Sequence, residues 1–337
     1  MKKILSVLLV LLMVFSMFML VGCGSEDAAS EDALKVCVVV PSGFGDKSFN
    51  DSAKEGAELL KSDLGVNVSY IECNNEGHKQ QMMNAADAAD VVVCVGWEFW
   101  EIGDVANEYP EVKFVWIDNA IENPADYPNL ECIMYAQNEG SFLAGYIAAS
   151  MSETGVIGAV GGEDGTTIND FMVGYEQGAK EANKDIEFVK NYADGDYENP
   201  ALGKELALAL NGQGADIIFQ IAGNTGSGVF QAAQEQGFKA IGVDKDQKIE
   251  FPSFDEQIIC SMKKEVGTSI YDTIKNYMET EEFLGGQIWI ADMANGYVSI
   301  VYGDENSKQF VSDDLKAKVE SLKDEIIAGN IEVKTTR

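Results

Sequence analysis

Arginine and histidine are almost absent from this chain of 337 residues: Arg337 is the only arginine and His78 the only histidine. Arginine is the usual residue for binding carboxylates and phosphates through two parallel hydrogen bonds. Unless the C-terminus folds back, a binding site here lacks that group. This argues against an amino acid, a nucleotide or a sugar phosphate as ligand. Codon or environmental bias is the alternative reason for so little arginine.

The single histidine also limits catalysis and metal binding. It excludes a metal site built from several histidines and leaves a Ser-His-Asp triad without redundancy. His78 stands where a polar loop, residues 74–77, meets a predicted helix. We interpret it as an exposed loop residue, and we expect neither a metal ion nor a cofactor.

Cysteine is scarce and lacks the spacing of metal or redox sites. The cysteines after Cys23 are odd in number, form no C-x-x-C pair and mostly lie in or beside apolar runs. They are Cys37, Cys73, Cys94, Cys132 and Cys260. Free cysteine behaves as a small buried hydrophobe, so we expect core residues rather than disulfides.

Basic residues are few: 24 lysines and arginines stand against 56 acidic residues, for a net charge of −32. A surface of this sign repels polyanions, so nucleic acid is not an expected partner. It also repels anionic lipid headgroups, so electrostatic attraction would not hold the protein at a membrane.

The N-terminus has the features of an export signal. Met1, Lys2 and Lys3 precede an apolar run over residues 4–19, and residues 20–23 read Leu-Val-Gly-Cys. This pattern resembles the signal peptide of a bacterial lipoprotein, which implies cleavage before Cys23 and a lipid on its sulfur. A transmembrane helix is the alternative. However, the run is short for a span, and residues 24–32 form a polar tether without a positive flank.

This reading divides the chain before any fold is considered. Residues 1–22 are the predicted signal peptide, and residues 23–34 are the acylated cysteine and a flexible tether. The remainder is expected to be a water-soluble domain, anchored by lipid on the extracytoplasmic face of the cell membrane.

Short apolar runs alternate with longer helical periods along the rest of the chain. Strands are predicted at 35–40, 66–72, 91–96, 112–117, 132–135, 156–160, 187–192, 217–221, 240–243, 258–262, 287–293 and 297–302. Helices are predicted at 50–61, 80–89, 141–150, 174–183, 200–212, 228–236, 266–280 and 312–328. Continuous apolar strands between helices indicate α/β architecture with doubly wound parallel sheets covered on both faces. The order repeats in two halves, roughly 35–153 and 154–258.

Ligand sites in such sheets lie at the carboxyl ends of the strands. The residues that follow the predicted strands are unusually polar and aromatic. They occupy 42–50, 97–100, 118–119, 162–164, 223–226 and 244–246. Asp118 and Asp244 each come directly after an apolar strand. Trp97, Phe99 and Trp100 we interpret as aromatics that pack between lobes rather than as ligand contacts.

The most specific stretch is residues 43–56, which join a glycine loop to the start of a helix. Candidate N-caps are Ser48, Asn50 and Asp51. Phe44 and Phe49 lie on either side of Asp46 at the end of a strand, an arrangement that suits a stacking platform. A capping motif with a hydrophobic staple from Phe49 is the alternative.

At this stretch the chain resembles a known family. Residues 46–53, Asp-Lys-Ser-Phe-Asn-Asp-Ser-Ala, are similar to a motif of the basic membrane protein family of ABC-transporter binding lipoproteins, the purine nucleoside receptors. Further matching segments run through the chain in order. They are 139–146, Phe171 with 174–179, 214–219, 222–230, 241–247 and 261–264.

The resemblance implies a fold like that of type I periplasmic binding proteins, with two doubly wound lobes and a ligand cleft between them. It also implies that the chain crosses between the lobes three times. We assign 35–153 and about 259–285 to the first lobe, and 154–258 and about 286–330 to the second.

The resemblance also implies a binding site for a purine nucleoside. The base would stack between Phe44 or Phe49 from the first lobe and Phe171 from the second. Asn50 and Asp118 would bond the base edge. Asp46 belongs to the same candidate set. A nucleoside is neutral, so such a site needs no arginine.

A second group of residues would recognise the ribose. The resemblance implies that Asp244, Lys264 and the backbone at Gly223 hold the hydroxyls. A carboxylate can accept hydrogen bonds from two vicinal hydroxyls, and lysine can donate to a hydroxyl oxygen while offsetting the buried charge.

The expected function is that of a monomeric, non-enzymatic substrate-binding lipoprotein that delivers a nucleoside to the permease subunits of an ABC importer. A receptor for a free sugar or small polyol, and a nucleoside-sensing surface lipoprotein, are the alternatives. A nucleoside hydrolase would need a dense aspartate cluster, which the sequence lacks. The chain departs from the family pattern at Lys54, at 163–168 and at 198–200, which leaves the preferred base open.

Overall fold

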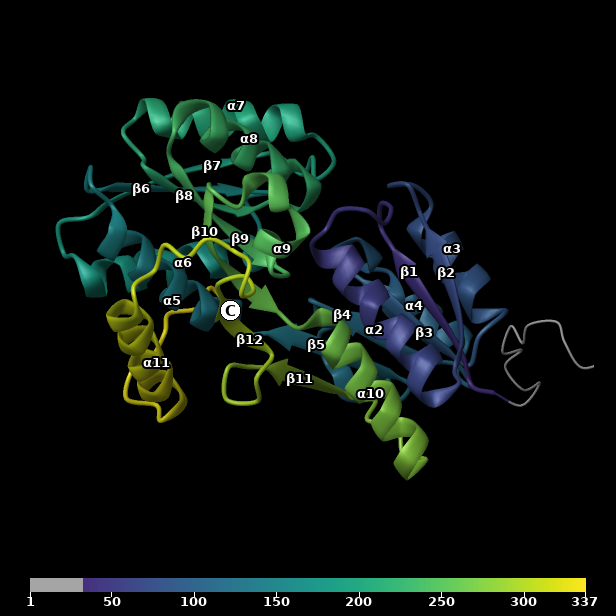
Figure 1. The fold of residues 1–337 in the computed structure, drawn as a ribbon. Helices are drawn as coiled ribbons and strands as arrows, with labels where there is room; N and C mark the ends of the chain where they lie inside the picture. Colours follow the sequence, from purple (N-terminus) through teal and green to yellow (C-terminus); the bar gives the residue numbers. More distant parts are fainter. Residues whose placement is uncertain (1–32) are drawn as a thin grey trace, which may run out of the picture. The chain divides into compact units, whose positions relative to one another are not determined.

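The computed structural model describes residues 33–337, drawn in colour in Figure 1. The predicted signal peptide, Cys23 and nearly all of the predicted tether lie outside the described residues. Within residues 33–337, no helix is both long enough and apolar enough to cross a membrane.

The first sheet contains six strands in the order β11-β5-β4-β3-β1-β2, all paired in parallel. Its strands are β1 (Lys35–Val40), β2 (Asn67–Glu72), β3 (Val91–Val95), β4 (Lys113–Ile117), β5 (Leu130–Tyr135) and β11 (Gln287–Ala291). Its helices are α2 (Phe49–Leu64), α3 (His78–Ala86), α4 (Ile102–Glu108) and α10 (Val266–Thr280). We call this sheet and these helices the first lobe.

The second sheet also contains six strands, in the order β12-β10-β9-β8-β6-β7, with only β12 antiparallel to its neighbour. Its strands are β6 (Val156–Gly161), β7 (Glu187–Tyr192), β8 (Ile217–Ile221), β9 (Lys239–Asp244), β10 (Ile258–Lys264) and β12 (Val298–Val301). Its helices are α5 (Gln137–Met151), α6 (Thr166–Ala182), α7 (Pro200–Gly212), α8 (Ser227–Gln236), α9 (Gln247–Glu250) and α11 (Asp313–Ile327). We call this group the second lobe. Short 3-10 turns are η1 (Trp97–Phe99), η2 (Pro124–Asp126), η3 (Gly223–Gly226) and η4 (Pro252–Phe254).

The expected α/β architecture with two doubly wound sheets is confirmed. The central strands β3 and β8 are buried along their whole length, as strands covered by helices on both faces must be. The edge strands β2 and β7 instead mix exposed and half-buried positions. A continuous apolar run such as Val91–Val95 therefore marks the centre of a sheet.

The two lobes exchange chain at three points, after β5, after β10 and after β11. The details differ from the predicted division. Strand β10 pairs with β9 in the second sheet, although 259–285 was assigned to the first lobe. Strand β11 pairs with β5 in the first sheet, although 286–330 was assigned to the second. Helix α5 packs on α6, so the first crossing already follows β5.

The physical reason is that the sequence of an apolar strand does not specify which sheet the strand joins. Its pattern states that both faces are buried, and the choice of neighbour depends on where the preceding helix returns the chain. Helix α10 does lie on α2 of the first lobe, as expected. A Cβ at Gly56 would stand 2.0 Å from the carbonyl oxygen of Gly267, so this helix contact requires glycine.

The cysteine prediction is confirmed and the histidine prediction is wrong. All five described cysteines are buried and unpaired. His78 is half-buried at the start of α3 rather than exposed on a loop. Its ring meets Phe99 edge to face, with 5.4 Å between the centroids. Phe99 is fully buried. Because the imidazole of His78 packs on this ring, it is partly removed from solvent although a polar loop precedes it.

Candidate ligand-binding site

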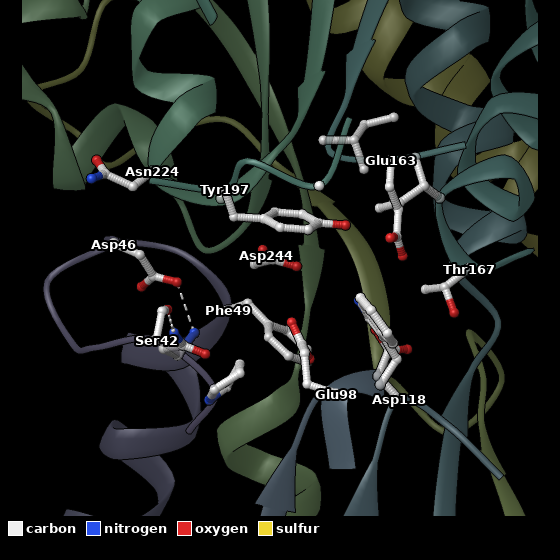
Figure 2. A pocket seen from close by; sticks show the side chains of 18 of the residues that line it. Ser42, Asp46, Phe49, Glu98, Asp118, Glu163, Thr167, Tyr197, Asn224 and Asp244 are labelled. Carbon is white, nitrogen blue, oxygen red and sulfur yellow. Dashed lines mark hydrogen bonds between the residues drawn. The ribbon is translucent and has the colours of Figure 1, made fainter. Parts of the chain in front are cut away.

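A pocket lies where loops at the carboxyl ends of both sheets meet, and both lobes line it (Figure 2). Eight of the nine predicted ligand-binding residues line this pocket. They are Asp46, Phe49, Asn50, Asp118, Phe171, Gly223, Asp244 and Lys264. The rule that parallel sheets bind ligands at their carboxyl ends therefore predicted where this pocket lies.

Phe44 is the one predicted residue that does not line the pocket. Its ring packs edge to face on Tyr70, with 5.4 Å between centroids, and the Nζ atom of Lys54 lies 4.7 Å from its centroid. The ring of Phe44 is thus engaged by Tyr70 of β2 and Lys54 of α2. Phe49 is thus the aromatic that this segment presents to the pocket.

Asp46 organises the loop that leads into α2. Its carboxylate accepts hydrogen bonds from the backbone N–H groups of Ser48, Asn50 and Asp51 at 2.9–3.0 Å. Burial raises the pKa of Asp46 to about 7, although these backbone bonds act in the opposite direction. Because the carboxylate of Asp46 satisfies the free N–H groups at the helix start, it does the work of an N-cap.

Asn50 has a similar structural duty. Its Nδ2 donates to Oγ of Ser42 at 3.1 Å and to the carbonyl oxygen of Gly43 at 2.9 Å. These bonds tie α2 to the loop that follows β1. Ser48 occupies the N-cap position, but its hydroxyl makes no capping bond and points elsewhere.

The Ser48 hydroxyl instead donates to Oδ2 of Asp244 at 2.5 Å, across the two lobes. A second contact also joins the lobes: Nζ of Lys264 in the second lobe lies 2.6 Å from Oδ2 of Asp118 in the first lobe. Both pairs are almost fully buried. Two polar contacts at the pocket wall therefore join the lobes.

Asp118 and Asp244 occupy equivalent places in the two lobes. Asp118 follows β4 and Asp244 ends β9, and both have left-handed backbone conformations, with φ of 66° and 65°. Aspartate adopts this conformation more readily than most residues, and such conformations cluster at functional sites. Burial raises the pKa of Asp244, while Lys264 and the Ser48 hydroxyl act to lower it.

Lys264 is surrounded by aromatic rings as well as by carboxylates. Its Nζ lies 4.7 Å from the ring centroid of Phe49, 5.1 Å from that of Tyr135 and 5.3 Å from that of Phe171. Ring faces attract a cation at such distances. A buried ammonium group is thus held at the junction of both lobes, where a neutral polar ligand can accept a hydrogen bond from it.

Sequence reasoning missed Tyr197, which lies on the loop between β7 and α7 and reaches into the pocket above Phe49 (Figure 2). A Cβ at Gly162 would stand 2.0 Å from Cε1 of this tyrosine, and one at Gly223 would stand 3.5 Å from Cδ1. The ring therefore rests on two glycine positions. Tyr197 lies five positions beyond β7 and outside the segments that carried the family resemblance, so neither line of reasoning pointed to it.

Phe171 contributes less ring surface to the pocket than Tyr197. It is only 2% exposed and packs against Phe219, with 6.3 Å between centroids. Tyr197 is half-buried, and burial raises the pKa of its phenol. Phe49 of the first lobe and Tyr197 of the second both line the pocket, together with Trp97 and the more deeply buried Phe171.

Two glutamates at the pocket were also missed as site residues. Glu98 belongs to η1 after β3, and Glu163 follows β6. Burial, with smaller effects from the charges of Glu163 and Asp118, raises the pKa of Glu98 to about 7. Burial likewise raises the pKa of Glu163. Of the neighbouring aromatics, Trp97 lines the pocket, whereas Trp100 is 67% exposed.

The only arginine does fold back toward this region. Nη2 of Arg337 lies 2.9 Å from Oδ2 of Asp170 and donates to the carbonyl oxygen of Tyr135 at 2.7 Å. Asp170 is fully buried beside Phe171. Since Arg337 is engaged in this way and does not line the pocket, the pocket wall contains no guanidinium.

Residues 33–337 match the family model described as "ABC transporter substrate-binding protein PnrA-like". The chain belongs to this family. The match spans essentially all of the described residues, and the family is the one that the motifs resembled.

Relatives and solved structures agree with this family assignment. Basic membrane protein A2 of Borrelia garinii subsp. bavariensis is 32% identical over 323 residues, which cover 95% of this chain and 94% of that protein. The ABC transporter nucleoside-binding protein BmpA of Lactococcus lactis subsp. cremoris is 32% identical over 346 residues, covering 94% and 95%. A crystal structure of an ABC transporter solute-binding protein from Aeropyrum pernix K1 superposes with a TM-score of 0.79 at 28% identity, covering 89% of this chain and 92% of that one.

Proposed function

We propose that this PnrA-like protein binds purine nucleosides in the pocket between its lobes. The observation that carries the proposal is an aromatic pair, Phe49 and Tyr197, combined with a buried aspartate and lysine in one pocket (Figure 2). The similarity to a relative named as nucleoside-binding supports the same ligand class. The pocket wall has no arginine, which suits a neutral ligand.

Each part of a nucleoside has a counterpart in this arrangement. A base between Phe49 and Tyr197 would gain about 1–3 kcal/mol from stacking on each aromatic face. Asp244 would accept hydrogen bonds from the ribose hydroxyls, and Lys264 would donate to a hydroxyl oxygen. Charge-assisted hydrogen bonds of this kind are roughly twice as strong as neutral ones.

A ligand would reach the pocket when the two lobes open. Ser48 with Asp244 and Asp118 with Lys264 hold the two walls together. Opening must break these pairs, and a bound nucleoside would replace part of them. We therefore propose hinge closure around the ligand, a movement that two-lobed binding proteins commonly undergo.

The biological role that we propose is ligand delivery to an ABC permease. The protein would act as a monomer on the extracytoplasmic face, held by lipid on Cys23. Mass spectrometry of the protein from membranes would detect a diacylglycerol-bearing Cys23 peptide. A Cys23→Ser variant should be released from the membrane fraction, and retention of that variant would contradict the lipid anchor.

Calorimetric titration tests the ligand proposal directly. The full chain in detergent would be unfolded, freed of bound ligand and refolded. It would then be titrated with guanosine, inosine, adenosine, cytidine, ribose and adenine. We expect heat from the purine nucleosides and none from ribose or free adenine at the same concentrations. Tight ribose binding would favour a sugar receptor, and silence from every nucleoside in folded protein would contradict the proposal.

A further inference from the structure

Seven carboxylates and a single lysine line the pocket, so acidic side chains far outnumber basic ones. The carboxylates are Asp46, Glu98, Asp118, Glu163, Asp196, Glu198 and Asp244. A neutral ligand that enters such a pocket gains most when it presents N–H and O–H donors. The question is which of these acceptors are still free.

Four of the seven accept hydrogen bonds from backbone, hydroxyl or amide groups of the protein, and a fifth, Asp118, pairs with Lys264. Asp46 accepts the backbone bonds of its own loop, and Asp244 accepts the Ser48 hydroxyl. Asp196 accepts a bond from Nδ2 of Asn199, and Glu198 accepts one from Nδ2 of Asn224. These groups are structural or, for Asp244, committed to the ribose in the proposed function.

The acceptors that remain are one oxygen of Asp118 and the carboxylates of Glu98 and Glu163. Asp118 is more than nine-tenths buried, and its Oδ1 has no hydrogen-bond partner, because Lys264 binds only Oδ2. Among the described residues, no side chain donates to Glu98 or Glu163. An unpaired oxygen on a buried carboxylate is costly, so Asp118 favours a ligand that supplies a donor, and the half-buried Glu98 and Glu163 line the same pocket.

These three carboxylates also lie close to one another. The charges of Glu163 and Asp118 both act on Glu98, and all three act on the Tyr197 phenol. Glu98 and Asp118 come from the first lobe and Glu163 from the second, so the cluster forms only where the lobes meet (Figure 2). It stands beside the aromatic ring proposed to stack on the base.

We infer that Glu98, Glu163 and Asp118 select a base whose edge carries adjacent N–H donors, as guanine does. The inference rests on the proposed function. Guanine offers N1–H and the exocyclic amino group side by side, a pattern that a carboxylate can accept in two parallel bonds. Hypoxanthine keeps N1–H but lacks the amino group. Adenine places the lone pair of N1 against the carboxylates.

The expected preference is therefore guanosine over inosine over adenosine. A good two-bond pairing to a base edge discriminates by about 1–3 kcal/mol, so guanosine should bind about tenfold to a hundredfold more tightly than adenosine. All three share the ribose, so contacts with Asp244 and Lys264 contribute equally and cancel in the ratio.

The test is calorimetric titration of the refolded full chain with guanosine, inosine and adenosine at pH 8. The variants are Glu98→Gln and Glu163→Gln, which keep side-chain size and remove the charge. We expect each to reduce the preference for guanosine over adenosine by about tenfold, the lower range for one lost pairing. Glu187→Gln is the matched control, since Glu187 is exposed at the start of β7.

The outcomes are distinct. Equal affinities for guanosine and adenosine in the unmodified protein would overturn the inference while leaving the nucleoside proposal standing. The same holds if both variants bind adenosine and keep the original ratio. Silence from every nucleoside would overturn both. If a variant fails to fold by circular dichroism, the ratio in the unmodified protein decides alone.

Discussion

The ring of Tyr197 occupies the space that a side chain at residue 162 would need, since a Cβ built on Gly162 would lie 2.0 Å from Cε1 of the tyrosine. Gly162 directly follows β6, and its backbone N–H donates to the carbonyl oxygen of Ile221 in β8. The backbone there is thus held by the sheet and has little freedom to retreat. Moving the Tyr197 side chain therefore costs less free energy than moving the backbone at residue 162.

Gly162→Ala should therefore displace Tyr197 and weaken nucleoside binding. Loss of one stacking face corresponds to about 1–3 kcal/mol, or about tenfold or more in affinity. Titration calorimetry measures the affinity, and circular dichroism checks the fold. Gly212→Ala is the matched control, because a Cβ there meets no atom within 4 Å. Unchanged affinity in Gly162→Ala would remove Tyr197 from the proposed site.

Asp244→Ala tests the ribose side of the pocket. The substitution removes the acceptor of the Ser48 hydroxyl and a carboxylate near Lys264. Because it would leave ribose hydroxyls unpaired in a buried site, we expect a loss of about 2–4 kcal/mol of nucleoside binding free energy. Affinity for guanosine, measured by calorimetry, is the readout.

The matched control for Asp244→Ala is Asp185→Ala, an exposed aspartate of the same lobe. It should bind as the unmodified protein does. If Asp244→Ala also binds nucleosides normally, the assignment of the ribose subsite is wrong.

Arg337→Ala should destabilise the protein. Asp170 is fully buried and accepts hydrogen bonds from Thr335 and Thr336, and among residues 33–337 Arg337 is the one cation that pairs with it. Removing one partner of a buried ion pair typically costs about 3 kcal/mol or more, because the remaining charge stays buried. Urea unfolding at neutral pH measures the change.

Two further variants separate charge from packing at this contact. Arg337→Ala combined with Asp170→Asn should regain part of the lost stability, since no uncompensated charge remains. Lys334→Ala removes an exposed cation from the same segment and should change stability little. A double variant no more stable than Arg337→Ala would show that the ion pair does not matter.

Glu131→Gln should stabilise the protein at alkaline pH. Glu131 lies within β5, is 3% exposed, and burial alone raises its pKa from 4.5 to about 7. Because the folded state holds this proton more tightly than the unfolded chain, stability falls as pH rises from about 4.5 to 7. At about 1.4 kcal/mol per pKa unit, the cost approaches about 3 kcal/mol above pH 7.

Unfolding in urea at pH 4 and pH 8 checks this prediction. Glu131→Gln should match the unmodified protein near pH 4, where the glutamate is protonated in both states, and exceed it at pH 8. Glu187→Gln, an exposed strand position, should show no such difference. A stability difference that is the same at both pH values would exclude titration of Glu131 as its cause.

Local patterns were enough to predict most elements of the fold. All twelve strands stand within a few residues of their predicted places, because a run such as Val91–Val95 can be buried on both faces only inside a sheet. Helix starts were harder to predict. Helix α6 begins at Thr166 rather than at 174, because its first turns hold polar residues whose burial comes from contacts with the pocket and the C-terminal segment.

The site was only partly predictable for the same reason. Asp118 follows β4 and Asp244 ends β9, so the strands alone place each at the carboxyl edge of its own sheet, and the meeting of the lobes brings both into one pocket. Tyr197 sits in a loop, and its approach depends on the absence of a side chain at Gly162, more than thirty positions earlier. Phe44 and Phe49 look equivalent along the chain, and only the contact of Phe44 with Tyr70 separates them.

The sequence by itself determined the element types, the two-sheet architecture, the family and the edge at which the pocket lies. Periodicity and the residue types at strand ends are local properties that can be recognised in the sequence alone. The tertiary structure alone decided that β10 and β11 join opposite sheets, that Arg337 pairs with Asp170, and which rings face the pocket. Each of these choices depends on which distant surfaces meet, and burial and pairing energies between such surfaces exist only after the chain has folded.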